Sequence, residues 1–405
     1  MLSALSRILR DPFLRIPTVT LFVSGLTYAS TLPYQSIIGI NELGLSDGMY
    51  SVLIFVAAGI NVAASVLLGI LSDRIGDRRP LVLALAVSGF TGFGLIYMLR
   101  SAPIFIACVL VLIPISNSTF SILFGSIRAT TNDMPRREAL SITSAVRAIY
   151  SGSWALMPGL VGLYLARSST MMPAYAVAAT ASAACFSLYF FFMPRSPRVA
   201  KTALAKEDGF LASMSRLTDP ALLTRLGVMA LITGMQRLST TLSPLITTHA
   251  AHGSVVDVGL TACGVAFLEM PFMLFWATMQ RRFHNVHVLA AGTAVYSAYL
   301  VLVSFASAPW HIYALIGINA FGAAAILSVP ISYLQDLIAD KPGLGSSLIA
   351  VNMFMSGGVA AILFAIGTAV TDYSGTALFG AVCGLVAAVA MLALDGRGTA
   401  PALAQ

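Results

Sequence analysis

Three ionisable side chains lie inside long apolar runs of this sequence: Arg147, Arg237 and Glu269. A charge near the centre of a bilayer costs roughly 2.5–3.5 kcal/mol on insertion scales, so such residues usually face a cavity and have a partner. Arg147 and Trp154 are two helical turns apart and therefore share one helix face. A guanidinium donates a planar fork of hydrogen bonds, and an indole offers a flat apolar surface. The pair predicts a binding site for a polar solute; the alternatives are a structural pair or an arginine that extends to the cytoplasmic surface.

Arg237 and Glu269 fall at similar depths of neighbouring apolar runs, and we expect them to neutralise one another. Glu269 is the candidate proton-coupling group, because burial favours a neutral carboxyl whereas a nearby Arg237 favours the charged form. The alternative is a permanent salt bridge that holds two helices together.

Neutral polar residues in the apolar runs are further candidates, since each either contacts a solute or hydrogen-bonds between helices. These candidates are Tyr28, Tyr34, Gln35, Asn117, Gln236, Asn319 and Asn352. The four cysteines lie in apolar runs without the spacing of a metal site or a disulfide framework. The sequence therefore predicts no metal site and no cofactor.

The composition is that of a protein surrounded by lipid. Only 10% of the 405 residues are charged and 58% are hydrophobic, with a mean hydropathy of +0.88, whereas soluble domains carry about 25% charged residues. We predict an all-α membrane protein with twelve transmembrane helices in two six-helix halves. The predicted spans are 16–40, 49–71, 80–99, 102–126, 139–165, 172–193, 222–248, 256–278, 286–306, 310–334, 345–371 and 375–394.

The distribution of Lys and Arg sets the predicted orientation, because these residues concentrate in cytoplasmic loops. With the N-terminus inside, Arg100 and Arg167 fall outside, Arg147 and Arg237 fall within spans, and the other Lys and Arg residues lie inside. Both termini are then cytoplasmic. The net charge of +7 reflects this topology, and we expect no nucleic-acid partner because the basic residues are dispersed over separate loops.

The longest polar stretch lies in the middle of the chain. It predicts an N-terminal six-helix half over 1–193, a cytoplasmic linker over 194–221 and a C-terminal six-helix half over 222–405. Six-helix repeats of this kind occur in secondary transporters.

The loop after the second predicted span reads Gly-Ile-Leu-Ser-Asp-Arg-Ile-Gly-Asp-Arg-Arg over residues 69–79. It resembles the signature loop of the major facilitator superfamily, in which Gly, three residues, Asp-Arg, one residue and Gly precede a basic cluster. The resemblance implies a gating role for Gly69, Asp73, Arg74, Gly76, Arg78 and Arg79. We expect Gly69 to permit close helix contact and Gly76 a tight turn. We expect Asp73 to accept hydrogen bonds when the cytoplasmic side closes; the alternative is an ordinary polar turn.

Within this superfamily the chain resembles the bacterial sugar efflux transporters along much of its length. The resemblance rests on residues 29–33, 72–79, 124–129, 146–148 with 153–154, and 333–336. It implies a monomeric secondary transporter of the inner membrane, which exports sugars or glycosides by alternating access and uses protons. The alternative is a proton-coupled transporter of another small solute, either a drug exporter or a nutrient importer.

The pairing of Arg147 and Trp154, together with Glu269, also resembles the sugar site of the lactose permease family. That family handles protons with a His and a Glu in span ten, where this sequence has Asn319 instead. The resemblance therefore implies a different coupling group here. The sequence has no nucleotide-binding loop, no HExxH motif and no repeated pore-filter sequence, so we expect neither an enzyme nor a channel.

Overall fold

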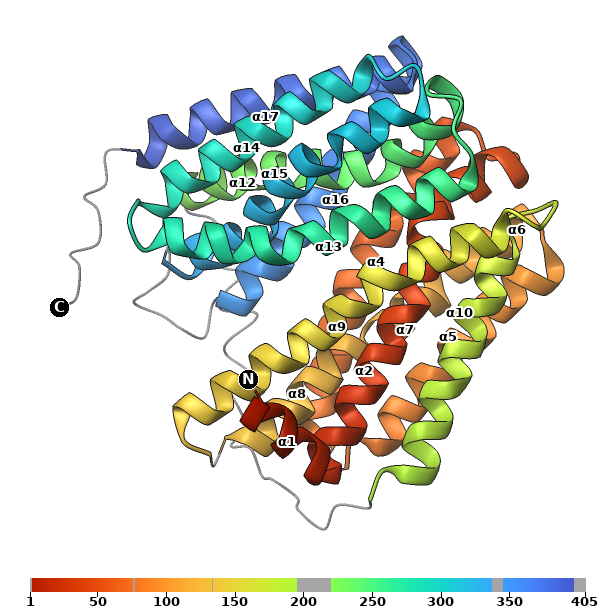
Figure 1. Ribbon diagram of the computed structural model, residues 1–405, viewed down its shortest axis with the longest axis vertical. Coiled ribbons are helices and arrows are strands. Elements are labelled where there is room, and N and C mark those ends of the chain that lie inside the picture. The colour runs from red at the N-terminus through yellow and green to blue at the C-terminus, as the bar shows by residue number, and fades with distance from the viewer. Residues whose placement is uncertain (1, 76, 133, 195–219, 337–344, 397–405) are drawn as a thin grey trace. The chain divides into compact units, whose positions relative to one another are not determined.

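The computed structural model describes residues 2–75, 77–132, 134–194, 220–336 and 345–396, and every regular element in this part of the chain is helical. The helices fall into two compact units (Figure 1). The first unit comprises residues 1–45 and 59–204, and the second comprises residues 46–58 and 205–405. The predicted linker, 194–221, lies almost entirely outside the described residues.

The elements from the N-terminus to residue 192 are α1 (Leu2–Arg10), α2 (Pro12–Thr31), η1 (Leu32–Tyr34), α3 (Gln35–Ile37), η2 (Ile38–Glu42), α4 (Asp47–Arg74), α5 (Arg79–Leu99), α6 (Ala102–Ala107), η3 (Cys108–Leu112), α7 (Ile113–Asn117), α8 (Thr119–Thr131), α9 (Arg136–Leu165), α10 (Pro173–Ser187) and η4 (Leu188–Phe192). Those that follow are α12 (Pro220–Leu245), η5 (Ile246–Ala250), α13 (Val255–Gln280), α14 (Asn285–Ser304), α15 (Pro309–Asp336), α16 (Gly345–Val370) and α17 (Tyr373–Asp395).

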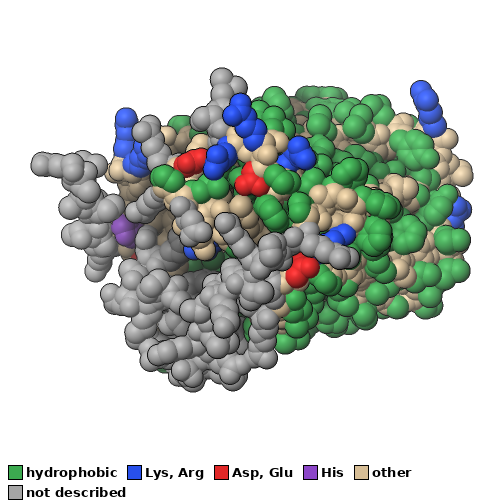
Figure 2. Space-filling model, turned by 90° about the horizontal axis from the view of Figure 1, so that it is seen from below, with side chains coloured by type: hydrophobic (Ala, Val, Ile, Leu, Met, Phe, Trp, Pro, Cys, Tyr) green, Lys and Arg blue, Asp and Glu red, His purple; other side chains and the backbone are tan. Residues whose placement is uncertain are grey.

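Within the described residues, nine helical stretches are long and apolar enough to cross a bilayer. They satisfy their backbone hydrogen bonds internally, which lipid requires of a spanning segment. The remaining three predicted spans coincide with α2 and its continuation, with α9 and with α12, which carry Arg15, Arg147 and Arg237 respectively. The number twelve therefore stays a prediction. Hydrophobic side chains cover much of the face drawn in Figure 2.

The first unit packs around α2, which contacts α8, α9 and α10, while α5 pairs with α10. Its core includes Leu14 of α2, Leu85 of α5 and Val146 of α9, all almost fully buried. A Cβ atom at Gly25 would lie 2.1 Å from the Oγ atom of Ser153. Glycine is therefore required where α2 crosses α9.

In the second unit, α14 packs between α15 and α17, α12 pairs with α16 and α17, and α13 pairs with α15. Close approach again depends on small residues, because a Cβ atom at Gly292 of α14 would lie 2.2 Å from the Cβ atom of Ala325.

The first part of α4, residues 47–58, also belongs to the second unit. The hydroxyl of Tyr373 donates to Oδ1 of Asp47 at 3.0 Å. A Cβ atom at Gly357 of α16 would lie 2.4 Å from the Cβ atom of Ala58. This stretch of α4 therefore packs directly on α16 and the start of α17.

Candidate functional site

Several aromatic side chains lie around Arg147 in the first unit. Phe120 and Phe124 are one turn apart on α8, and their ring centroids are 4.7 Å apart. Tyr150 of α9 packs on Phe120 with a centroid distance of 4.8 Å, and its hydroxyl interacts with the Trp154 side chain. The guanidinium carbon of Arg147 lies 6.0 Å from the centroid of Phe124. We call these four aromatic residues together with Arg147 the aromatic–arginine site.

Little of this site is buried in the core of its unit. Arg147 is exposed, Trp154 and Tyr150 are half-buried, and 39% of Phe120 is exposed. A cation over a ring is attracted by the negative ring face. The contact with Phe124 therefore orients the guanidinium while most of its donors remain free to bind a ligand.

The structure brings together the predicted pair, Arg147 and Trp154, through residues that the sequence reasoning did not single out. Tyr150 joins them because residues three and four apart share a helix face. Phe120 and Phe124 could have been found from their spacing of one helical turn within a single apolar run. The same spacing, however, is equally typical of an ordinary packing contact.

Tyr28 lies close to this site. Its hydroxyl donates to Oγ of Ser116 at 3.2 Å, its ring contacts Phe93 edge-on, and it interacts electrostatically with Tyr150. Gln35 and Asn117 are half-buried, and neither forms a side-chain hydrogen bond within the described part of the chain.

Tyr34 has a different position. Its side chain is fully buried, and its hydroxyl donates to the carbonyl oxygen of Pro158 at 2.7 Å. This bond joins η1 to α9, so the described geometry of Tyr34 is that of a helix-packing residue.

Arg237 and Glu269 do not form the expected ion pair, since within the described residues no contact of 4.0 Å or less joins their charged atoms. Arg237 is exposed on α12 and Glu269 is half-buried on α13. The sequence gives the depth of each residue but not the rotation of its helix. Gln236, next to Arg237, is half-buried.

Glu269 lies near a set of hydroxyl groups instead. Tyr296 and Tyr299 of α14 are each 3% exposed, and Tyr296 interacts electrostatically with Glu269. The Tyr296 hydroxyl also interacts with Ser239 of α12. The Tyr299 hydroxyl interacts with Ser239, Ser243 and Asn319. We call these five residues (Ser239, Ser243, Tyr296, Tyr299 and Asn319) the hydroxyl cluster; the sequence reasoning identified only Asn319.

Asn352 of α16 is almost buried. Its Nδ2 atom donates to Oγ1 of Thr233 at 3.4 Å, whereas its Oδ1 atom is buried without a hydrogen-bond partner among the described residues.

An apolar cavity of about 430 Å³ also lies in the second unit, lined by Phe55 of α4 and by residues of α12 and α16.

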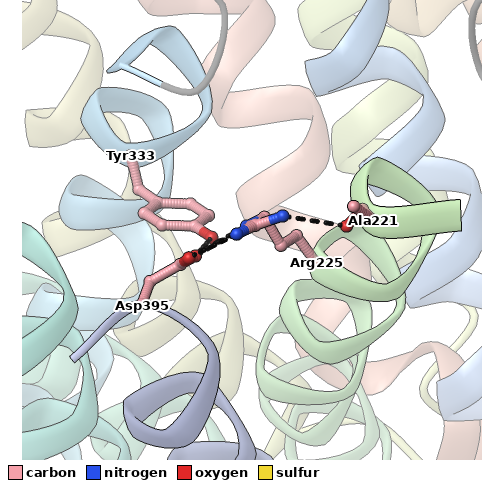
Figure 3. A network of polar contacts seen from close by, with 4 residues as sticks. All are labelled: Ala221, Arg225, Tyr333 and Asp395. Atoms are coloured by element: carbon pink, nitrogen blue, oxygen red, sulfur yellow. Dashed lines mark hydrogen bonds and ion pairs between the residues drawn. The ribbon is translucent and has the colours of Figure 1, made fainter. Parts of the chain in front are cut away.

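A clamp joins three helix ends in the second unit (Figure 3). The Arg225 guanidinium of α12 donates through Nη2 to Oδ1 and through Nε to Oδ2 of Asp395, at 2.7 and 2.9 Å. The hydroxyl of Tyr333 donates to the same carboxylate. The arrangement ties the start of α12 to the ends of α15 and α17, and it gives Tyr333 a packing role.

The predicted gating loop is only partly described. Gly76 lies outside the described residues, as do the side chains of Asp73 and Arg74. The role of Gly69 in close helix contact stays a prediction, since no described atom lies within 4 Å of the position of a Cβ atom there.

The two arginines at the end of this loop contact the first unit. The Arg79 guanidinium donates to the carbonyl oxygen of Phe190 and lies 6.0 Å from the centroid of that ring. The Arg78 guanidinium lies 3.6 Å from the Cβ position of Gly125. The loop end is thus attached to η4 and α8.

A sequence model of the Major Facilitator Superfamily matches residues 18–268, which is more than half of the chain. The chain belongs to the major facilitator superfamily. It is a membrane transporter, not an enzyme, and the predicted resemblance to this superfamily is confirmed.

The chain is similar to several curated sugar efflux transporters. Sugar efflux transporter B of Salmonella typhimurium is 26% identical over 349 residues, which cover 85% of this chain and 87% of the relative. Sugar efflux transporter C of Escherichia coli is 24% identical over 381 residues, covering 92% and 93%.

Solved structures show the same fold. The nucleoside transporter NupG aligns with a TM-score of 0.80 over 96% of this chain and all of that chain, at 12% identity. An auto-inhibited peptide transporter of the POT family aligns with a TM-score of 0.75 over 96% and 98%, also at 12% identity. At such identities the likeness concerns the fold alone.

Proposed function

We propose that this transporter exports sugars or glycosides by alternating access, in exchange for protons. The names of the curated relatives, at about one-quarter identity, support the solute class. We further propose that it works as a monomer in the inner membrane, with twelve spans, both termini cytoplasmic, and six-helix halves over 1–193 and 222–405.

The observation that carries this proposal is the aromatic–arginine site. A sugar ring has a C–H face and hydroxyl groups around its edge. The rings of Phe120, Tyr150 and Trp154 offer apolar faces for the first. The guanidinium of Arg147, held over Phe124, offers several donors to the second. Recognition of hydroxyls by a fixed fork favours a polyol over an apolar drug.

Proton coupling is assigned to Glu269. A carboxyl without a cationic partner within 4.0 Å in the described structure can change its protonation state without leaving an unpaired arginine behind. Tyr296, which interacts electrostatically with Glu269, belongs to the hydroxyl cluster, which also holds Asn319. Protonation of Glu269 would then change the charge beside a set of groups that joins α12, α14 and α15. Arg237 supplies a positive charge on the same unit but is not its partner here.

The test is transport into inside-out membrane vesicles that carry an imposed pH gradient, acidic inside. We expect labelled sugars or glycosides to accumulate in the vesicles, and a protonophore to abolish the accumulation. Vesicles without the protein are the control. Accumulation of cationic dyes with no movement of any sugar in the panel would reject sugar export. Sugar movement that is insensitive to the pH gradient would reject proton coupling while leaving the solute class intact.

A further inference from the structure

The short helix α1 precedes the first long helix and has two distinct sides. Successive residues of a helix are rotated by about 100°, which places Leu5, Ile8 and Leu9 on one side and Arg7 and Arg10 on the other. A basic amphipathic helix of this kind is typical of segments that lie in the plane of a membrane surface.

Contacts within the first unit hold α1 in a fixed orientation. Ile8 is 2% exposed and belongs to the core cluster of that unit. Nε of Arg7 lies 3.8 Å from the carboxylate of Glu138 on α9. At the bend into α2, Asp11 accepts a hydrogen bond from the backbone N–H of Phe13 at 2.9 Å. The guanidinium of Arg15 donates to the carbonyl oxygen of Leu9 at 3.3 Å, which satisfies the C-terminal end of α1.

This fixed orientation leaves an apolar pair uncovered. Leu5 and Leu9 are 41% and 56% exposed, and they lie one turn apart on the same side of the helix. Arg10, on the other side of the helix, is exposed as well. The acidic groups nearby are already engaged, since Asp11 caps α2 and Glu138 lies against Arg7. Figure 2 shows basic and acidic side chains among hydrophobic ones on the face seen from below.

We propose that α1 docks on an anionic phospholipid surface. Leu5 and Leu9 enter the boundary between headgroups and acyl chains, and Arg10 and Arg15 lie at the level of the phosphates. Two observations select this occupant. The exposed charges are basic, which complements an anionic leaflet. The chain passes from Arg10 through Asp11 directly into α2, so the apolar pair is continuous with the first predicted span.

The first test locates the apolar face in lipid. In the full-length protein with its four cysteines replaced, an environment-sensitive fluorophore is attached to Leu5→Cys or to Ser6→Cys, neighbouring residues that point in directions about 100° apart. The labelled proteins are reconstituted into vesicles that contain brominated phospholipid. We expect quenching several times stronger at position 5 than at position 6. Equal quenching at the two positions, or none at position 5, overturns the proposal.

The second test concerns the anionic headgroup. The association of spin-labelled phosphatidylglycerol and phosphatidylcholine with the reconstituted protein is compared for Arg10→Gln and for Arg167→Gln, an exposed arginine elsewhere in the same unit. We expect Arg10→Gln to lower the preference for phosphatidylglycerol by up to about fivefold, which is the effect of one basic residue near an anionic surface. We also expect added salt to weaken this preference in the native protein. An unchanged preference in Arg10→Gln, or an equal loss in Arg167→Gln, overturns the proposal.

Discussion

Arg147 lies over an aromatic ring and not against a carboxylate. Within the described structure, its guanidinium lies over the ring of Phe124, and no acidic group lies within 4.0 Å of it. A guanidinium in this setting keeps its fork of donors available. An arginine neutralised by a carboxylate would have lost the same donors to its partner.

The geometry predicts that Arg147→Lys weakens solute binding. A lysine keeps the charge but cannot present the planar fork. The loss of a charged hydrogen bond is worth about 1.5–3 kcal/mol, or roughly tenfold or more in Kd. Binding of the identified sugar to the purified protein measures the effect, with Arg167→Lys as the matched control. An unchanged Kd in Arg147→Lys would remove Arg147 from the site.

A second prediction at this scale concerns Glu269. Glu269→Gln mimics the protonated carboxyl and cannot release a proton. We expect it to abolish accumulation driven by a pH gradient but to spare exchange of labelled for unlabelled solute. Tyr296→Phe, which removes the neighbouring hydroxyl, is expected to shift the pH dependence of driven transport without abolishing it. Full driven transport by Glu269→Gln would assign coupling to another group.

At the scale of elements, the contact between α2 and α9 depends on one glycine. In Gly25→Ala the new Cβ atom would meet Oγ of Ser153 at 2.1 Å, which forces the two helices apart. We expect a loss of about 1–3 kcal/mol in stability, as in other overpacked cores. Gly94→Ala on α5 is the control, because nothing lies within 4 Å of its Cβ position.

Thermal unfolding midpoints in detergent compare these variants. The midpoint of Gly25→Ala should fall, and Ser153→Gly should restore part of it because the clashing side chain is removed. The midpoint of Gly94→Ala should stay the same or rise, since alanine favours helices over glycine. Equal midpoints for the two alanine variants would show that α2 and α9 are not tightly packed.

A carboxylate joins η2 to the segment before α10. Glu42, beyond the end of the first predicted span, accepts a hydrogen bond from the backbone N–H of Met171. Burial raises the pKa of the Glu42 carboxyl above its ordinary value of 4.5, although the Met171 bond and the charge of Arg100 act against the shift. The folded chain then binds this proton more readily than the unfolded chain. The contribution of the protonated Glu42 carboxyl to stability is therefore present below pH about 4.5, and it is lost as the pH rises through the raised pKa of Glu42.

Glu42→Gln should therefore be more stable than the native chain at neutral pH and similar to it near pH 4, because the amide oxygen still accepts the Met171 bond while no charge is buried. Unfolding midpoints measured across this pH range test the expectation. A variant that is less stable at neutral pH would show that the ionised carboxylate stabilises the fold.

The positions of the helices could be predicted because lipid imposes a long apolar run on each span. The predicted range 80–99 corresponds to α5, and 286–306 to α14. The contacts of individual residues could not be predicted in the same way. Arg237 and Glu269 were correctly placed within helices but not paired, and Tyr34 turned out to be buried on α9. Hydropathy gives depth in the membrane, whereas contacts depend on helix rotation and tilt.

At the scale of the whole molecule, the division of the chain into units does not follow the order of the sequence. A fragment of residues 205–405 lacks residues 46–58, which pack on α16 at Gly357 and bind Tyr373 through Asp47. We expect this fragment to be degraded in cells when expressed alone, and to persist when 1–204 is expressed with it. Pulse-chase labelling measures both half-lives. A half-life of 205–405 that is the same with and without 1–204 would show that the α4 contacts are dispensable.

The clamp around Asp395 limits how the C-terminus can be altered for purification. Asp395 is the last residue of α17, and its carboxylate holds Arg225 and Tyr333. A chain shortened before this residue would leave a guanidinium and a phenol without their acceptor at the base of two other helices. An affinity tag should accordingly be attached beyond residue 396, with a spacer long enough to leave the Asp395 carboxylate bound to its two partners.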